Sequence, residues 1–319
     1  MSAERLLVLH DHPEEVLPVL EARAPGLRVA VATQPSAVGP ALETHQPTVV
    51  FSIKHSGFPG PAHRPVVHHP TVRWVHVGGS GIEHLSPWPA HVQVTNSAGV
   101  LAPFLAETAM AALLSLTTGL HRYGHAQRER RWAPARFQAL AGRTLLVVGV
   151  GATGGEVALR AKALGMRVVG VRASGAPHPA VDAMHRPSAL AGLLSEADVV
   201  SLHLRHTPQT HHLLDAAALA RMRPGALLLN SARGGVVDQD ALIAALRSGQ
   251  LGGAWLDVFA VEPLPGDSPL WAMPSVIITP HAADMVEDFP ARFAARFCDL
   301  LPQYLAGRPL PVVAPPDGG

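Results

Sequence analysis

A glycine-rich turn between an apolar strand and a helical segment is the first feature with a chemical meaning. The run TLLVV, Thr144–Val148, leads directly into GVGATG at positions 149–154, which is a GxGxxG pattern. In this setting the first glycine permits a tight turn, and the second lets the backbone approach a pyrophosphate. The third allows helix and strand to pack closely, while the helix N-terminus supplies N–H donors to the phosphates. The pattern therefore predicts a dinucleotide site.

The end of the next predicted strand, Arg167–Val171, bears on which dinucleotide binds. A site for NAD usually carries Asp or Glu here, which holds the ribose 2′-hydroxyl. This chain has Arg172 instead, with Ser174 two residues further on. A guanidinium cannot accept the proton of that hydroxyl, but it pairs with a 2′-phosphate. The sequence therefore favours NADP, and NAD is the alternative.

Three polar side chains further along the chain each follow the end of a predicted strand. They are Arg233, Glu262 and His281, in the segments NSARGG, AVEPL and TPHAA. Each has an ordinary explanation when it is considered singly, such as a cap, a loop carboxylate or a strand-end histidine. Ligands of doubly wound sheets, however, bind beyond the carboxyl ends of the strands. The three side chains are therefore candidates for one site.

Short apolar strands alternate with helical segments along almost the whole chain. The expected strands are Arg5–Leu9, Thr48–Ile53, Val72–Val77, Val92–Asn96, Arg143–Gly149, Arg167–Val171, Val199–His203, Ala226–Asn230, Gly253–Val258 and Val276–Thr279. Such alternation predicts parallel sheets covered by helices. The last six strands make the number of a complete dinucleotide-binding fold. One long helix is expected from about Pro103 to Arg131.

These motifs, in this order, resemble the D-isomer-specific 2-hydroxyacid dehydrogenase family, which includes glyoxylate/hydroxypyruvate reductases and phosphoglycerate dehydrogenases. The resemblance covers nearly the whole chain and is strongest from Val94 to Ala283. It implies an active site of Arg233, Glu262 and His281. An arginine fork binds the carboxylate or keto oxygen of a 2-oxo acid, and a histidine exchanges a proton with the carbonyl oxygen. A glutamate beside the histidine orients its ring.

The resemblance also assigns binding residues. The loop Gly79-Ser80-Gly81 is expected to hold the substrate carboxylate through backbone N–H groups, together with Arg233. Asp257 is expected to hold the nicotinamide carboxamide. The full set of expected cofactor contacts is Gly149, Gly151, Ala152, Thr153, Gly154, Arg172, Ser174, Thr207, Ser231, Ala232 and Asp257. Asp284 departs from the family pattern, in which Gly or another small residue is common there, and this departure leaves the choice of substrate open.

The expected fold class is α/β, with two doubly wound parallel-sheet domains. A Rossmann cofactor domain, residues 98–284, is inserted into a smaller flavodoxin-like substrate domain made of residues 1–97 and 285–319. The expected site lies in the cleft between the two domains.

Composition excludes several other classes of protein. The chain of 319 residues has 25 Lys and Arg against 24 Asp and Glu, so no strong field attracts nucleic acid or an anionic membrane. The single cysteine, Cys298, excludes a disulfide framework. The apolar run Leu6–Leu9 is too short for a signal peptide, and a cytoplasmic location is expected. Although the chain has 19 histidines, none shows zinc-motif spacing, so no metal is expected.

The function expected from these observations is an NAD(P)-dependent oxidoreductase, active as a homodimer. It interconverts a small 2-oxo acid and its D-2-hydroxy acid by hydride transfer, as a glyoxylate/hydroxypyruvate-type 2-ketoacid reductase does. Two alternatives stay open. One is a nicotinamide-binding regulatory module of the corepressor type, and the other is a short form of D-3-phosphoglycerate dehydrogenase.

Overall fold

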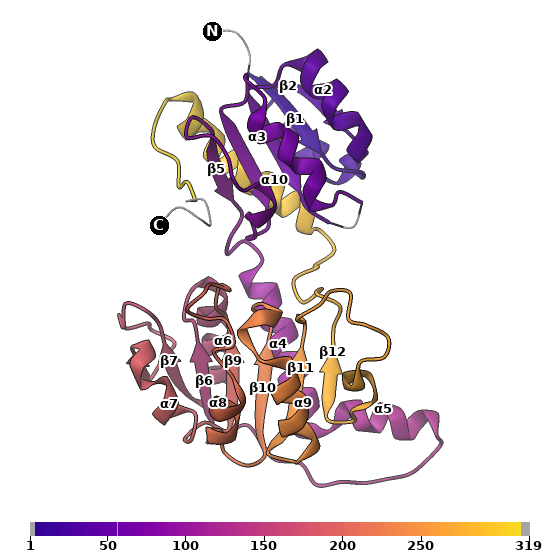
Figure 1. Ribbon diagram of the computed structural model, residues 1–319, viewed down its shortest axis with the longest axis vertical. Helices are drawn as coiled ribbons and strands as arrows, with labels where there is room; N and C mark the ends of the chain where they lie inside the picture. Colours follow the sequence, from indigo (N-terminus) through magenta and orange to yellow (C-terminus); the bar gives the residue numbers. More distant parts are fainter. Residues whose placement is uncertain (1–3, 56, 314–319) are drawn as a thin grey trace. The chain divides into compact units, whose positions relative to one another are not determined.

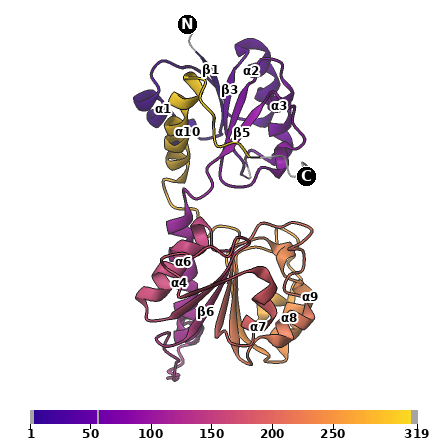
Figure 2. The ribbon, with the colours of Figure 1, turned by 90° about the vertical axis from the view of Figure 1, so that its left-hand side faces the viewer.

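The computed structural model describes residues 4–55 and 57–313 (Figure 1). The chain forms two compact units. The first consists of Met1–Leu101 together with Val286–Gly319, and the second is Ala102–Met285. Each unit has its own parallel sheet with helices on both faces (Figure 2).

The first unit is built on a five-stranded sheet in the order β2-β1-β3-β4-β5. Its strands are β1 Arg5–Leu9, β2 Arg28–Ala32, β3 Val49–Ile53, β4 Trp74–Gly78 and β5 Gln93–Asn96, and its helices are α1 Leu17–Arg23, α2 Val38–His45, α3 Arg64–His68 and α10 Phe289–Leu305. Helices α1 and α10 cover one face, and α2 and α3 cover the other (Figure 2). Every residue of β3 and β4 is buried, because both faces of a central parallel strand are covered.

The second unit has a seven-stranded parallel sheet in the order β12-β11-β10-β9-β6-β7-β8. The strands are β6 Thr144–Val148, β7 Arg167–Val171, β8 Ala183–His185, β9 Val199–Leu202, β10 Ala226–Asn230, β11 Leu251–Leu256 and β12 Val276–Ile278. The helices are α4 Ala102–Thr118, α5 Leu120–Arg128, α6 Ala152–Ala163, α7 Leu190–Leu193, α8 Ala216–Arg221 and α9 Gln239–Arg247. The strand order reverses at β6, so the topological switch point lies where β6 ends.

Alternate residues of β6 fill two separate cores. Leu145 and Val147 pack with Trp255 in a cluster that includes the apolar residues of α4 and α6. Leu146 and Val148 belong to the opposite cluster, with the apolar residues of α8 and α9. A strand buried on both faces must be apolar at every position, which explains the uninterrupted run before the glycine turn.

The expected fold class is confirmed, since both units are parallel α/β sheets, but three elements differ from the sequence expectations. Strands β2 and β8 were not expected; both lie at sheet edges and are only partly buried, and β8 has only three residues. The single helix expected over 103–131 is wrong. It is divided into α4 and α5, which are bent by 67°, and Gly119 between them has a φ of 77°.

Within the described residues, no single helix has both the length and the apolar content needed to cross a membrane. In the part of the chain that the structure describes, the bent pair α4 and α5 meets those two criteria when its two helices are taken together.

Candidate active site

Three neighbouring strands of the second sheet carry the predicted active-site residues just beyond their carboxyl ends. Arg233 follows β10, Glu262 follows β11 and His281 follows β12. Strands β10, β11 and β12 are consecutive and parallel, so the three loops leave the sheet at the same edge. This common edge is where doubly wound sheets bind their ligands.

The structure brings His281 and Glu262 into direct contact. Nδ1 of His281 lies 2.8 Å from Oε2 of Glu262, and both side chains are about half exposed. The other carboxylate oxygen of Glu262 accepts the Phe259 backbone N–H at 3.0 Å, which fixes the carboxylate. The ring is therefore oriented through Nδ1, and Nε2 is the nitrogen left to meet a ligand.

The backbone at His281 is held in an uncommon conformation. Its φ is 53°, in the left-handed region, although the residue is not glycine. The His281 N–H donates to the backbone oxygen of Asp257 at 2.9 Å, which ties the loop after β12 to the end of β11. Such conformations cluster at functional sites, where the surrounding structure enforces them.

The buried Asp257 joins the same two loops through its side chain. Its Oδ1 accepts the Thr279 hydroxyl at 2.6 Å and the Ala282 backbone N–H at 2.9 Å. The sequence predicted a nicotinamide contact for this carboxylate. The structure adds a positioning role, because these hydrogen bonds fix the segment on which His281 sits.

The turn that carries Arg233 packs directly against the loop that carries Glu262. A Cβ atom at Gly234 would lie 1.9 Å from the backbone oxygen of Phe259, so only glycine allows this approach. Nη1 of Arg233 donates to the backbone oxygen of Ala232 at 2.7 Å. This bond uses one of the five N–H donors of the guanidinium.

Asp284 lies close to this group and has a perturbed carboxyl. Burial is the main cause of its raised pKa, and the nearby Asp257 carboxylate adds to the effect. His281 and Arg233 act in the opposite direction. Asp284 is thus part of the electrostatic environment of the site. The sequence indicated this residue only because the family commonly has Gly or another small residue at its position.

The three glycines of the predicted phosphate-binding turn have different surroundings. Gly149 has a φ of 98°, and a Cβ there would lie 2.3 Å from the backbone oxygen of His203. A Cβ at Gly154 would lie 2.2 Å from the oxygen of Gly149, so this glycine permits the contact between α6 and β6. Gly151 has nothing within 4 Å of its Cβ position, and a phosphate can approach the backbone there.

The remaining cofactor candidates lie on loops of the same sheet. Ala152 and Thr153 begin α6, and Thr207 lies on the loop after β9, where its N–H donates to Thr210 Oγ1 at 2.8 Å. Ser231 and Ala232 follow β10. The buried Oγ of Ser231 has no hydrogen-bond partner among the described residues. Together with the open backbone at Gly151, this unpartnered hydroxyl fits a bound dinucleotide.

A second arginine, which was not predicted from the sequence, contacts the turn that follows β7. Arg172 Nε donates to Ser174 Oγ at 2.9 Å, so the two predicted residues are in contact. Arg186, which follows β8, donates to the Ala173 backbone oxygen at 3.4 Å. Strand β8 was not expected, and Arg186 therefore had no predicted position next to Arg172.

The predicted substrate loop Gly79-Ser80-Gly81 belongs to the first unit, where it follows β4. Gly79 has a φ of 99°, and its backbone oxygen accepts the Ser97 N–H at 2.9 Å. The backbone oxygen of Ser80 accepts Asn96 Nδ2 at 2.8 Å. Both bonds use carbonyl oxygens, so they leave the N–H groups of the loop for an anionic ligand.

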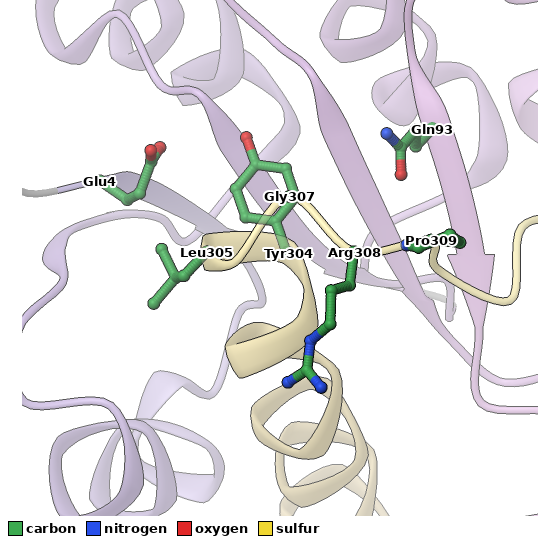
Figure 3. A pocket seen from close by; sticks show the side chains of 7 residues that line it. All are labelled: Glu4, Gln93, Tyr304, Leu305, Gly307, Arg308 and Pro309. Atoms are coloured by element: carbon green, nitrogen blue, oxygen red, sulfur yellow. The ribbon is translucent and has the colours of Figure 1, made fainter.

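A pocket of the first unit lies at the end of its sheet opposite to the loop Gly79-Ser80-Gly81 (Figure 3). It is lined by Glu4, Gln93, Tyr304, Leu305, Gly307, Arg308 and Pro309. Glu4 precedes β1 and Gln93 begins β5, so the pocket is at the amino ends of the strands. It contains none of the predicted site residues, and ligands of such sheets bind at the carboxyl ends.

The glycine turn at the switch point and the polar residues beyond adjacent strands define a dinucleotide-dependent α/β enzyme. Comparison with known proteins identifies the family. The sequence model described as "D-isomer specific 2-hydroxyacid dehydrogenase, NAD binding domain" matches residues 110–283. A glyoxylate reductase from Korarchaeum cryptofilum is 35% identical over 247 residues, which are 72% of this chain and 71% of that protein.

Solved structures give the same result. A D-isomer specific 2-hydroxyacid dehydrogenase family protein from Aeromonas salmonicida superimposes with a TM-score of 0.89 at 33% identity, over 99% of this chain and 100% of that one. A D-isomer specific 2-hydroxyacid dehydrogenase from Xanthobacter autotrophicus, in complex with NADPH and MES, gives a TM-score of 0.83 at 31% identity, over 99% of each chain. The chain belongs to the D-isomer specific 2-hydroxyacid dehydrogenase family. It is therefore a nicotinamide-dependent oxidoreductase that interconverts 2-oxo acids and 2-hydroxy acids.

Proposed function

We propose that this enzyme is an NADPH-dependent reductase of a small 2-oxo acid, of the glyoxylate or hydroxypyruvate type. The observation that carries the proposal is the 2.8 Å contact between His281 and Glu262. These residues follow β12 and β11, and β11 is the neighbour of β10, which precedes Arg233. A general acid and an anion-binding fork are the two groups that reduction of a 2-oxo acid needs from the protein.

The residues have distinct roles in this mechanism. A bound nicotinamide supplies the hydride. The Arg233 guanidinium binds the substrate carboxylate and polarises the keto oxygen, while the N–H groups of Gly79, Ser80 and Gly81 bind the same carboxylate. The protonated His281 ring donates the Nε2 proton to the keto oxygen as the carbonyl carbon is reduced. Glu262 stabilises the imidazolium and holds the ring through Nδ1.

The preference for NADP rests on the cationic groups at the end of β7. Arg172 replaces the carboxylate that would bind a 2′-hydroxyl, and its neighbour Ser174 adds a donor. Arg186 brings a second guanidinium to the same turn. Two guanidinium groups suit a 2′-phosphate, and the Xanthobacter relative was solved with NADPH.

The choice of a small substrate is supported by the glyoxylate reductase from Korarchaeum cryptofilum, the relative with 35% identity. The proposal assigns substrate binding to residues 1–97 and 285–319, and cofactor binding to residues 98–284. Asp257 and the residues of the glycine turn then bind the cofactor. Asp284 limits the pocket, because a half-buried carboxylate disfavours substrates with a second anionic group nearby.

We further propose a homodimer located in the cytoplasm. Large apolar side chains are exposed on and after α5, including Trp132 at 96%, Phe137 at 61% and Leu120 at 61%. Exposed large apolar side chains that lie close together in the sequence are compatible with an interface between protein chains. A second copy of this chain is the partner that the family relationship favours.

A substrate panel tests the proposed activity. Glyoxylate, hydroxypyruvate, pyruvate and 2-oxoglutarate are each reduced with NADPH and with NADH, and 3-phosphoglycerate is oxidised with both oxidised cofactors. We expect the highest kcat/KM for glyoxylate or hydroxypyruvate with NADPH. Turnover restricted to 3-phosphoglycerate would instead identify a phosphoglycerate dehydrogenase, and nicotinamide binding without any turnover would identify the regulatory module.

A further inference from the structure

We propose that His10, Asp11 and His55 form a binding site for one divalent transition-metal ion, of which Zn²⁺ is the best match. His10 and Asp11 directly follow β1, and His55 lies two residues beyond β3. Strands β1 and β3 are hydrogen-bonded neighbours and run parallel, so their carboxyl ends meet. One potential ligand atom from each of the three residues lies within 4.8 Å of the others.

The three side chains converge on one carboxylate oxygen. Asp11 Oδ1 lies 3.2 Å from His10 Nδ1 and 3.1 Å from His55 Nε2, within the distance of an ion pair between a carboxylate and a protonated imidazole. Asp11 Oδ1 and His55 Nε2 are buried atoms without a hydrogen-bond partner among the described residues. Buried polar atoms in native proteins are almost always satisfied by protein, water or an ion. One cation between them satisfies both.

The spacing of these atoms suits a tetrahedral ion. Ligands bound to zinc at about 2.0–2.2 Å are separated by about 3.4 Å, which is close to the two measured contacts. Two imidazoles and one carboxylate are a typical ligand set for Zn²⁺. Mg²⁺ and Ca²⁺ bind oxygen ligands, so two imidazole nitrogens disfavour them at this site. A water molecule or substrate oxygen then completes the fourth position.

Glu15 provides the outer contact that a metal-bound histidine requires. If His10 binds the ion through Nδ1, its Nε2–H faces Glu15 Oε2 at 3.5 Å. Histidine ligands usually donate their second ring N–H to a carboxylate in this way, which fixes the tautomer. The Nε2 atom of His10 is buried, and its lack of any other partner among the described residues is explained by the same arrangement.

Metal binding changes two backbone contacts of the metal-free protein. The His12 N–H donates to His10 Nδ1 at 3.0 Å, and the Gly57 N–H donates to His55 Nδ1 at 3.2 Å. The ion replaces the first bond. The Gly57 peptide must turn so that His55 Nδ1 can carry a proton while Nε2 binds the metal.

Gly57 also holds the carboxylate in position. A Cβ atom there would lie 2.0 Å from Asp11 Oδ2, so the Asp11 side chain packs directly on the glycine backbone. No metal was predicted from the sequence, because these ligands do not lie at the short spacing of a zinc motif. This cluster instead joins residues far apart in the chain, which only the pairing of β1 with β3 brings together.

Zinc binding by the full-length protein tests the proposal directly. The protein is dialysed against a chelator and titrated with Zn²⁺ by calorimetry, and Co²⁺ is used as a spectroscopic probe. We expect one equivalent of Zn²⁺ to bind at micromolar concentration, a tetrahedral Co²⁺ absorption band, and a higher Tm with Zn²⁺. Asp11→Asn and His55→Ala should each weaken binding at least about tenfold. Circular dichroism of the metal-free variants checks that they fold.

A matched control separates this site from other surface histidines. His206 and His211 form an exposed pair in the second unit, with 3.0 Å between their ring nitrogens, and His211→Ala should leave zinc affinity unchanged. Two results would overturn the proposal. One is no binding of Zn²⁺ at micromolar concentration, and the other is undiminished affinity in both Asp11→Asn and His55→Ala.

Discussion

Arg233 shows what a single residue contributes to the proposed reaction. Its Nη1 is held by the Ala232 carbonyl, so the planar guanidinium is oriented before substrate binds. Arg233→Lys keeps the charge but loses the fork that binds two oxygens at once. We expect kcat/KM for the 2-oxo acid to fall about 10- to 100-fold, since each charge-assisted hydrogen bond contributes roughly 1.5–3 kcal/mol. Steady-state kinetics measure the change, and an unaltered kcat/KM would mean that another group binds the carboxylate.

The proposed preference for NADP depends on another single residue, Arg172. Arg172→Asp replaces the phosphate-binding group with one that accepts a 2′-hydroxyl proton. The ratio of kcat/KM for NADPH to that for NADH should fall by about 100-fold or more, through a loss with NADPH and a gain with NADH. Ser174→Ala is a milder control, because it removes one neutral donor. A wild-type enzyme that uses both cofactors equally would remove the basis of this prediction.

The sequence predicts single residues of the proposed site but not how they are held. Arg233, Glu262 and His281 are predicted because each follows a strand and matches a family motif. The hydrogen bonds from Thr279 and Ala282 to Asp257 could not be predicted, since they depend on how two loops cross. Arg186 was missed because β8 has no apolar run.

The glycine turn is the element to which the proposal assigns the cofactor phosphates. Two of its glycines allow effects on stability to be distinguished from effects on cofactor affinity. Gly154→Ala puts a methyl group 2.2 Å from the Gly149 oxygen, which forces α6 away from β6. The free energy of unfolding should fall by at least about 1–3 kcal/mol, the usual range for overpacking. Gly151→Ala meets no atom within 4 Å, so it should fold normally and lose affinity for NADPH instead.

Urea unfolding and fluorescence titration with NADPH measure the two effects. Equal stability of the two variants would contradict the roles given to these glycines.

The turn itself was predictable, because the strand, the glycines and the helix are adjacent in the sequence. The break between α4 and α5 was not, since Gly119 within an apolar helical pattern is compatible with a continuous helix.

Buried histidines make the stability of the whole molecule sensitive to acid. Burial lowers the pKa of His76, in the first unit, to about 3 and that of His203, in the second, to about 4. Both rings are neutral in the folded protein, while in the unfolded chain they bind protons with a pKa near 6.5, the ordinary value for histidine. The unfolded state therefore gains protons first as pH falls, and stability is lost from about pH 6.5 downwards.

We expect the free energy of unfolding to fall by about 1.4 kcal/mol per pH unit for each such histidine between pH 6 and pH 4.5. Urea unfolding at several pH values measures the slope. His203→Gln removes one titrating group, and its hydrogen bond to Ser201 Oγ can be retained, so the slope should become shallower even if the variant is less stable. A stability independent of pH over this range would contradict the burial of these rings as neutral groups.

At the scale of the whole chain, the fold class was predictable because βα alternation extends from end to end. The metal cluster at His10, Asp11 and His55 was not, since it depends on which strands are neighbours in the sheet. Strand order is a property of the assembled unit that local sequence patterns do not contain.

The central claim is that the His281–Glu262 pair supplies the proton for reduction of a 2-oxo acid. The most direct measurement is the pH dependence of kcat/KM for glyoxylate reduction by the wild type and by Glu262→Gln, with NADPH. Reduction needs the imidazolium, so the wild-type rate should fall as pH rises. Loss of the Glu262 carboxylate destabilises the imidazolium, so the profile of the variant should move to lower pH. His281→Ala should lose about 10²–10⁴-fold in turnover while it still binds NADPH. Near-normal turnover of His281→Ala, or an identical pH profile for Glu262→Gln, would contradict the account.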